Sequence, residues 1–402
     1  MKATGSSQAN VSASQEPGTM HHVVSKYKLP LDVKYCTKCV ISNQRPRINF
    51  DEHGVCSACN FAIRKQHVID WDERERQLCD LLDRYRSKDG FHDVVVPCSG
   101  GKDSAFVAHQ LKCKYGMHPL TVTWTPHIYT EVGWENLQSF IHVGGFDNIL
   151  GTPNGKIHRV LTKLAFEHLG DPFQPFIYGQ RSFPMRIAVK FNIPLIMYGE
   201  DGEVEYGGEP KDARSVLGAG EELLRHAYSG VNVLEWAKHG IPEKDLYYYL
   251  PPSPEEFRRV GAEMRFFGYH KKWVPQENYY YAMENTGFRA NPDGRSEGTY
   301  SKYAGLDDRI DGFHYYMAYV KFGIGRATSD AAHEIRDGHI TRDEGVALVR
   351  RYDGEFPQKY FREFLEYADI SEQRFRQIVD SFRPPHLWKQ VGGEWKLKHQ
   401  VS

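Results

Sequence analysis

Short apolar runs alternate with longer segments of helical periodicity through the middle of the chain. The runs lie at residues 94–96, 120–124, 148–150 and 194–198. Between them, apolar side chains recur at helical spacing, which predicts helices that connect successive strands. The pattern therefore predicts an α/β fold with a parallel sheet covered by helices on both faces. Ligands of such sheets bind outside the carboxyl ends of the strands, so we expect the ends of the first, second and fourth strands to form one cleft.

The same patterns divide the rest of the chain. A helix is predicted over residues 70–87, with an apolar face formed by Leu78, Leu81, Leu82 and Tyr85. Near the end of the chain, Thr341 and Glu344 form a capping box and Ser371 begins a further helix. We expect a tail over residues 1–30, a metal-binding module over 31–65, a connecting helix over 66–90, the sheet domain over 91–250, an aromatic-rich substrate-binding region over 251–330 and a mostly helical region over 331–402.

Composition excludes some classes of protein. The 51 basic and 52 acidic side chains give a net charge of −1, whereas a large nucleic-acid surface would leave a basic excess. No apolar stretch reaches the roughly 18 residues of a membrane span. The first 25 or so residues are rich in Ser, Gln and Gly without the apolar core of a signal peptide, and we expect them to be disordered. Together these features predict a cytoplasmic protein.

Four of the seven cysteines form two CxxC pairs, Cys36 with Cys39 and Cys56 with Cys59, separated by 16 residues. This spacing is typical of a structural zinc site with four thiolate ligands. Iron in the same four sulfurs is an alternative. A site with four protein ligands has no open position for a substrate, although a zinc ribbon can also bind nucleic acid or a partner protein.

The most informative motif is Ser-Gly-Gly-Lys-Asp-Ser, at residues 99–104, between the first strand and a predicted helix over residues 104–115. Gly100 and Gly101 allow backbone amides to approach an anion closely, and the following helix adds its positive dipole end. A Walker A loop is excluded, because it needs Gly where Val96 stands and Ser or Thr where Asp103 stands. The alternative is a glycine-rich turn that binds nothing.

An acidic stretch, Gly-Glu-Asp-Gly-Glu-Val-Glu, follows the fourth strand at residues 199–205. Mg²⁺ in nucleotide sites is held by one or two carboxylates together with phosphate oxygens. We expect Asp103 and Glu200 to provide these carboxylates. For Asp201, Glu203 and Glu205, an acidic surface loop without a ligand is an equal alternative.

The 99–104 motif resembles the SGGxDS motif of PP-loop ATP pyrophosphatases. Together with the CxxC pairs and the segments DPFQPFIYGQ (171–180), PLIMYGEDGEVEYGG (194–208) and EGTYSKYAGLDDRIDGFHYY (297–316), it resembles the N-acetyl sugar amidotransferases of lipopolysaccharide O-antigen, pseudaminic acid and legionaminic acid synthesis. The resemblance implies a PP-loop enzyme that converts an acetamido group of a nucleotide-linked or nonulosonic sugar into an acetamidino group through an adenylated imidate. ATP, Mg²⁺ and Zn²⁺ would be its cofactors.

Candidate residues follow from this resemblance. Lys102, Asp103 and Glu200 are the catalytic candidates, and the nucleotide would bind Ser99, Gly100, Gly101, Lys102, Asp103 and Ser104. We expect adenine near Thr123 and Trp124, at the end of the second strand. The sugar-binding candidates come instead from composition: basic and aromatic side chains mix in the Gly-containing segment 273–328, which suits a sugar-nucleotide pocket formed by Arg289, Lys302, Tyr303, Arg309 and His314. For any single one of them, a core of stacked aromatics with solvated charges is an equal alternative.

The resemblance implies that ammonia comes from a separate glutaminase subunit, and an ammonia-conducting subunit is a further candidate partner. The cysteines outside the CxxC pairs, Cys79, Cys98 and Cys113, have no glutaminase context. Two other functions remain open. A tRNA-thiolating enzyme also combines zinc cysteines with this loop, but no cysteine follows Cys113, where catalytic thiols would be expected. A zinc-ribbon adaptor without activity is the second alternative.

Overall fold

The computed structural model describes residues 23–208 and 230–402. Its centre is a five-stranded parallel sheet in the order β3-β2-β1-β4-β5, which confirms the predicted α/β class. In this order the strands span Asp147–Gly151, Pro119–Trp124, Val94–Pro97, Leu195–Tyr198 and Glu263–Phe266. Val95 in the middle of the sheet pairs with Leu120 of β2 and Ile196 of β4.

Helices cover both faces of this sheet because successive strand side chains point in opposite directions. Val94 and Val96 pack against α3 (Trp71–Tyr85), α4 (Lys102–His109), α5 (Glu131–His142) and α12 (Pro275–Thr286). Val95 faces the opposite layer, which contains α6 (Gly155–Leu169) and α7 (Gln174–Phe191). The helix after β1 begins at Lys102 and continues as a π-helical turn, η1, over Gln110–Lys114.

The fifth strand was not predicted. Its sequence Glu-Met-Arg-Phe is short, and it pairs with one neighbour, β4, at the edge of the sheet. The apolar run that marks a fully buried strand is therefore missing. As a result, the sheet continues beyond residue 250, into the region expected to form a separate substrate-binding segment.

The expectation for the N-terminal tail is wrong in part, whereas the mostly helical C-terminal region is confirmed. Helix α1, Val23–Tyr27, lies inside the expected tail of residues 1–30, and Val23 and Leu29 are buried. The expected disorder of residues 1–22 lies outside the described residues. Within the mostly helical region 331–402, β6 (Trp388–Val391) and β7 (Glu394–Leu397) form an antiparallel hairpin.

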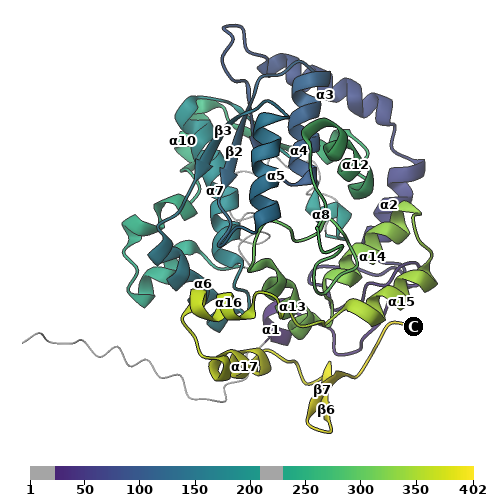
Figure 1. Cartoon of the computed structure of the whole chain (residues 1–402). Helices are drawn as coiled ribbons and strands as arrows, with labels where there is room; N and C mark the ends of the chain where they lie inside the picture. Colours follow the sequence, from purple (N-terminus) through teal and green to yellow (C-terminus); the bar gives the residue numbers. More distant parts are fainter. Residues whose placement is uncertain (1–22, 209–229) are drawn as a thin grey trace, which may run out of the picture.

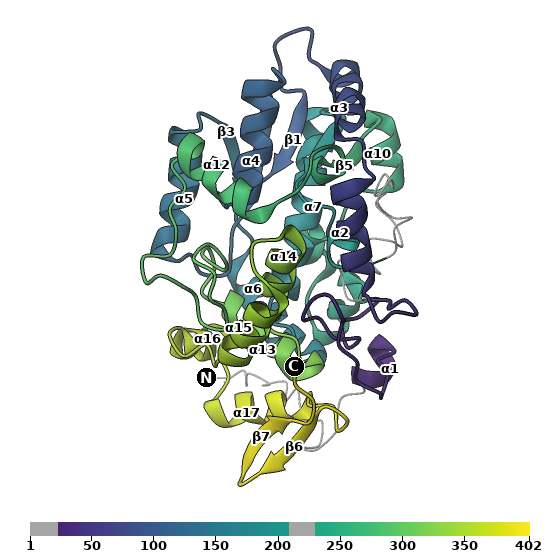
Figure 2. The same ribbon diagram turned by 90° about the vertical axis from the view of Figure 1, so that its right-hand side faces the viewer.

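The C-terminal helices lie beyond one end of the sheet, next to the cysteine module. Figure 1 shows α13, α16 and α17 below the sheet, and Figure 2 shows α2 beside α14. Cys36 and Cys56 share an apolar cluster with Ile324, Ala331 and Val346. The remaining helices are α2 (Ser57–His67), α8 (Gly202–Glu205), η3 (Val233–His239), η4 (Glu243–Tyr249), α10 (Pro254–Val260), α11 (Phe267–His270), α13 (Asp311–Phe322), α14 (Arg326–Asp337), α15 (Arg342–Tyr352), α16 (Phe361–Ala368) and α17 (Glu372–Ser381). Among the described helices, none has the length and apolar character needed to cross a membrane.

Candidate functional site

The Ser-Gly-Gly-Lys-Asp-Ser loop turns sharply from β1 into α4. Gly100 has a φ of +82°, and a Cβ built there would lie 2.6 Å from the backbone nitrogen of Leu137 in α5. Neither the conformation nor the space allows a side chain at this position. Gly101 caps α4, and its carbonyl accepts a hydrogen bond of 3.0 Å from the Ser104 hydroxyl. The loop thus holds a helix N-terminus at the carboxyl end of β1, the arrangement that binds anions.

Three cavities with shared walls extend from this loop. The first, here called the loop cavity, has a volume of about 270 Å³ and is lined by the loop, Trp124, Gln180 and Glu200. The second, the acidic cavity, has about 340 Å³ and shares Ser99, Asp103, Phe176, Gln180 and Glu200 with the first. The third, the outer cavity, also has about 340 Å³ and shares Gly305, Asp311, Tyr315 and Arg326 with the second. A continuous groove therefore runs from the end of β1 to the C-terminal helices.

Asp103, in the first turn of α4 after β1, and Glu200, two residues after the neighbouring strand β4, line the same two cavities. Asp103 forms an ion pair with Lys102 and accepts a hydrogen bond of 3.1 Å from Asn278. Burial, together with the negative charge of Asp103, raises the pKa of Glu200 to about 7, and Lys102 opposes this rise. Mg²⁺ in nucleotide sites is typically held by one or two carboxylates together with phosphate oxygens, and Asp103 and Glu200 provide two such carboxyl groups in one cavity. The site therefore fits this ion.

The acidic cavity is named for its seven carboxylates, which are opposed by Lys102 and Arg326. Arg326 forms an ion pair of 3.0 Å with Asp330 and donates a hydrogen bond to the Tyr315 hydroxyl. Burial, followed by the charges of Asp311 and Asp308, raises the pKa of Asp307 to about 7. The full set of carboxylates is Asp103, Glu200, Asp307, Asp311, Asp330, Glu334 and Asp337.

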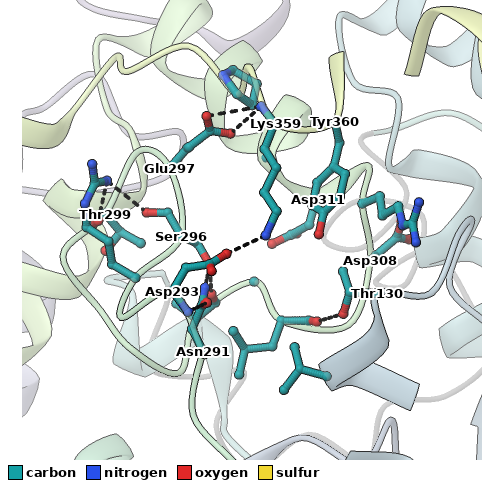
Figure 3. A pocket seen from close by; sticks show the side chains of 18 of the residues that line it. Thr130, Asn291, Asp293, Ser296, Glu297, Thr299, Asp308, Asp311, Lys359 and Tyr360 are labelled. Carbon is teal, nitrogen blue, oxygen red and sulfur yellow. Dashed lines mark hydrogen bonds and ion pairs between the residues drawn. The ribbon is translucent and has the colours of Figure 1, made fainter. Parts of the chain in front are cut away.

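The outer cavity has mixed charge. Figure 3 shows Lys359 and Asp293 pointing toward each other, and their charged atoms lie 2.6 Å apart. The backbone amide of Lys359 donates to Glu297, and the Thr130 hydroxyl donates to a carbonyl. Hydroxyl, amide, carboxylate and ammonium groups thus face one space, which suits a polar ligand with many hydroxyl groups.

The structure brings part of the predicted sugar-binding set to this groove. Tyr303 lines the acidic cavity, 5.2 Å below the Lys102 ammonium group, and Arg309 lines the outer cavity. Three predicted residues do not line any of the three cavities. Arg289 is exposed and pairs with Glu135 at 3.1 Å, Lys302 lies over the Tyr279 ring, and His314 pairs with Asp171 at 2.8 Å.

The side chains of Thr123 and Trp124 face opposite sides of the sheet, and only Trp124 lines a cavity of the groove. Trp124 lines the loop cavity, whereas the Thr123 hydroxyl lies 2.9 Å from the Asn148 side chain and 3.1 Å from the Cys98 sulfur. Because side chains alternate along a strand, these two neighbours cannot both face the same layer. The expectation that both would contact adenine is thus inconsistent with the geometry.

The four cysteines of the CxxC pairs are buried, and their sulfurs lie within 4.8 Å of one another. The Cys36–Cys59 and Cys39–Cys56 sulfur pairs are 3.9 and 3.8 Å apart. A tetrahedral ion with metal–sulfur bonds of about 2.3 Å requires sulfurs about 3.8 Å apart. The group therefore fits a single tetrahedral metal ion, which the sequence predicts to be zinc.

The cysteine module is also connected to the groove by a buried ion pair. Lys65, on α2, lies 3.0 Å from Glu205 and 3.4 Å from Asp337, and it donates to the Trp273 carbonyl. Asp337 lines the acidic cavity. Glu205 is the last residue of α8, the short helix that begins two residues after Glu200. Glu205 is thus a buried structural partner and not part of an exposed acidic loop.

The comparisons with known proteins come from sequence and from structure. Residues 297–402 match the family model "LPS biosynthesis protein WbpG-like, C-terminal domain". The segment that matches this model is here called the WbpG-like domain. This domain supplies Tyr303, Asp311, Tyr315, Arg326 and Asp330 to the acidic cavity. The Ser-Gly-Gly-Lys-Asp-Ser loop and the WbpG-like domain thus line one cavity. A search of curated proteins finds no match.

Solved structures show partial likeness. The U34-tRNA thiolase NcsA from Methanococcus maripaludis with its [4Fe-4S] cluster has 14% identity and a TM-score of 0.30, covering 79% of this chain and 86% of that chain. NMN synthetase from Francisella tularensis has 10% identity and a TM-score of 0.30, covering 75% and 98%. NH3-dependent NAD synthetase from Campylobacter jejuni has 13% identity and a TM-score of 0.18, covering 48% and 92%. At these scores the superpositions carry no argument about function.

Several groove residues were not among the predicted site residues: Gln180, Asp307, Asp311, Tyr315, Arg326 and Asp330. Three of them, Asp307, Asp311 and Tyr315, lie in the 297–316 segment, whose polar and aromatic pattern indicated a binding region without distinguishing individual side chains. Helical spacing could have identified Asp311 and Tyr315, which share one face of α13.

Replacing Gly100 with Ala should abolish nucleotide binding. An alanine is strained at the φ of this position, which costs about 1–2 kcal/mol. Its Cβ would also collide with the backbone of α5, so the loop would have to move. Gly90→Ala is the matched control, because Gly90 has the same φ of +82° with no atom within 4 Å of the added Cβ. We expect ATP-dependent pyrophosphate release to fall at least about a hundredfold in Gly100→Ala. Equal activity in the two variants would contradict the proposed role of the loop.

The pH dependence of stability should reflect Asp307. Its folded pKa of about 7 is above the ordinary value, so its stabilising contribution is complete at low pH and is lost as the pH rises through 7. Asp307→Asn keeps a neutral side chain and should be more stable than wild type at about pH 8, on the order of 1–2 kcal/mol, with the gap narrowing below pH 7 and closing below about pH 4. Thermal melting across this range measures the difference. A gap that widens toward low pH would contradict the assignment.

Proposed function

We propose that the chain is an ATP-dependent amidotransferase that converts an acetamido group of a nucleotide-linked or nonulosonic sugar into an acetamidino group. One observation carries the proposal: the Ser-Gly-Gly-Lys-Asp-Ser loop and the WbpG-like domain line the same acidic cavity. The first is suited to a nucleoside triphosphate, and the second belongs to proteins described as acting in LPS biosynthesis. A nucleotide and a sugar could therefore meet in this groove.

The proposed chemistry has two displacement steps. The amide oxygen of the sugar attacks the α-phosphorus of ATP, and the bond to pyrophosphate breaks. Ammonia then attacks the amide carbon, and the former amide oxygen leaves with AMP. The products are pyrophosphate, AMP and a protonated amidine. Adenylation is needed because an amide carbon is a poor electrophile and its oxygen a poor leaving group.

The chain's own residues would position and stabilise these groups. Ser99, Ser104 and the loop amides would bind the terminal phosphates, and Lys102, whose side chain is 11% exposed, would neutralise charge on the departing pyrophosphate. Mg²⁺, when held by Asp103 and Glu200, would supply further positive charge at the phosphates. The shared walls of the three cavities support this arrangement, because a sugar bound in the outer cavity would lie next to the cavity that contains these residues.

The proposal also covers the metal of the cysteine module, the source of ammonia and the cellular location. We propose zinc as the ion of the four cysteines, with a structural role, because the closed and buried sulfur set leaves no substrate position. Ammonia would come from a glutaminase subunit, and an ammonia-conducting subunit is a further proposed partner. The enzyme would act in the cytoplasm in O-antigen or nonulosonic acid synthesis. The family resemblance supports these points.

A tRNA-thiolating activity is less well supported. Cys98 is the one cysteine among the residues that line the three cavities. Burial raises the pKa of its thiol to about 11, so the nucleophilic thiolate form is scarce.

The proposal predicts coupled product formation. Incubation of the chain with ATP, ammonium chloride and a panel of diacetamido sugars should yield AMP, pyrophosphate and a sugar in which one oxygen is replaced by an NH group, as measured by mass spectrometry. Asp103→Asn should abolish turnover without changing the metal content of the cysteine site. Formation of ADP in place of AMP, or turnover that persists in Asp103→Asn, would refute the mechanism.

The ammonia source can be tested on the same preparation. Without a partner subunit, ammonium chloride should support turnover and glutamine should not, because none of the residues lining the groove provides a reactive thiol. If the purified chain used glutamine as efficiently as ammonium chloride, a separate glutaminase would be unnecessary and this part of the proposal would be wrong.

A further inference from the structure

Three side chains with metal-binding atoms meet at the amino ends of the strands, opposite the groove. His92 lies just before β1, His118 immediately precedes β2 and Asp147 begins β3. Their ligand atoms all lie within 4.8 Å of one another, because β1, β2 and β3 are neighbours in the sheet. We propose that these residues form a second metal site, which binds a divalent transition-metal ion such as Zn²⁺.

The hydrogen bonds of both histidines favour metal binding. The Nδ1 atom of His92 lies 3.3 Å from the His118 carbonyl oxygen, and that of His118 lies 3.1 Å from the Gly90 carbonyl oxygen. A carbonyl oxygen can only accept, so each Nδ1 carries a proton, and in the neutral imidazole each Nε2 then has a lone pair available for a metal ion. Metal-bound histidines typically donate their other ring nitrogen to a carbonyl or carboxylate in this way.

The spacing of the ligand atoms also suits one ion. The Nε2 atom of His92 is 3.6 Å from an Oδ atom of Asp147. Two ligands bound at about 2.0–2.2 Å in a tetrahedral site lie about 3.3–3.6 Å apart. The His118 and Asp147 side chains are exposed, so small rotations can complete the site.

The backbone that carries the ligands is firmly held. The buried Asp93 carboxylate accepts from the backbone amides of His118 and Ser87 at 2.8 and 3.2 Å, and the Asp93 amide donates to the His118 carbonyl. The Thr121 hydroxyl donates to the Asp147 carbonyl at 2.6 Å. The ligand positions therefore exist before an ion binds, which lowers the entropic cost of binding.

This site is separate from the proposed reaction. His92 is seven residues before Ser99 along β1, a separation of about 20 Å in an extended strand. Two imidazoles and a carboxylate suit Zn²⁺ and similar ions, whereas Mg²⁺ prefers oxygen ligands. An ion here would bridge three strands, so its expected effect is to stabilise the sheet edge.

Zinc stoichiometry tests the site on the full chain. After dialysis against a weak chelator that leaves the four-cysteine site filled, equilibrium dialysis with ZnCl₂ should show one additional zinc ion per wild-type chain. His118→Ala should lose this ion, and Asp147→Asn should bind it at least about tenfold more weakly. His142→Ala, which removes an exposed histidine on α5, should match wild type.

Added zinc should also raise the melting temperature of wild type and His142→Ala but not of His118→Ala. Binding of Co²⁺ in place of zinc distinguishes the second site from the four-cysteine site. An ion bound at His92, His118 and Asp147 has no thiolate ligand and therefore adds no thiolate-to-cobalt absorption band. Equal zinc stoichiometry and affinity in wild type and Asp147→Asn, an exposed isosteric change, would overturn the proposal even if His118→Ala folded poorly. Pyrophosphate release is independent of either result.

Discussion

The close contact between Gly100 and α5 is the constraint on which the site depends. The loop backbone approaches the Leu137 backbone so closely that a methyl group cannot fit. This contact fixes the direction in which β1 turns into α4, and with it the positions of Lys102, Asp103 and Ser104. Because α5 also contacts the WbpG-like domain, where Gly133 lies against Asp307, the same helix supports both sides of the acidic cavity.

The wall of the acidic cavity opposite the sheet is formed by a segment from later in the chain. Parallel strands bring Asp103 and Glu200 to one edge, but the carboxylates that face them come from residues 307–337. That segment is held by the cysteine module through the buried ion pairs of Lys65 with Glu205 and Asp337. Removing one partner of such a pair leaves a buried charge without compensation, which is strongly destabilising. The module thus helps to hold the wall of the groove in place, in addition to providing the four-cysteine site.

The sequence predicted the parts of the fold that local patterns encode. Buried parallel strands read as apolar runs, so four of the five strands were identified, and the CxxC spacing placed four sulfurs that the structure brings together. Edge strand β5 lacked the run because charged residues alternate with apolar ones. In the site, the loop motif located one end of the groove. The choice of Arg289, Lys302 and His314 failed to identify lining residues, since composition does not reveal which side of a long segment faces a cavity. Arg326 and Asp311 reach it through helix packing that involves distant parts of the chain.

The long separation between the cysteine module and its covering residues has a consequence for biosynthesis. The module is synthesised early, yet its apolar side is buried by Ile324, Ala331 and Val346, which leave the ribosome nearly three hundred residues later. Contacts between such distant residues form slowly because a long loop must close first. During translation the nascent module therefore exposes an apolar surface for many seconds, a period in which chaperones or a bound metal ion would protect it from aggregation.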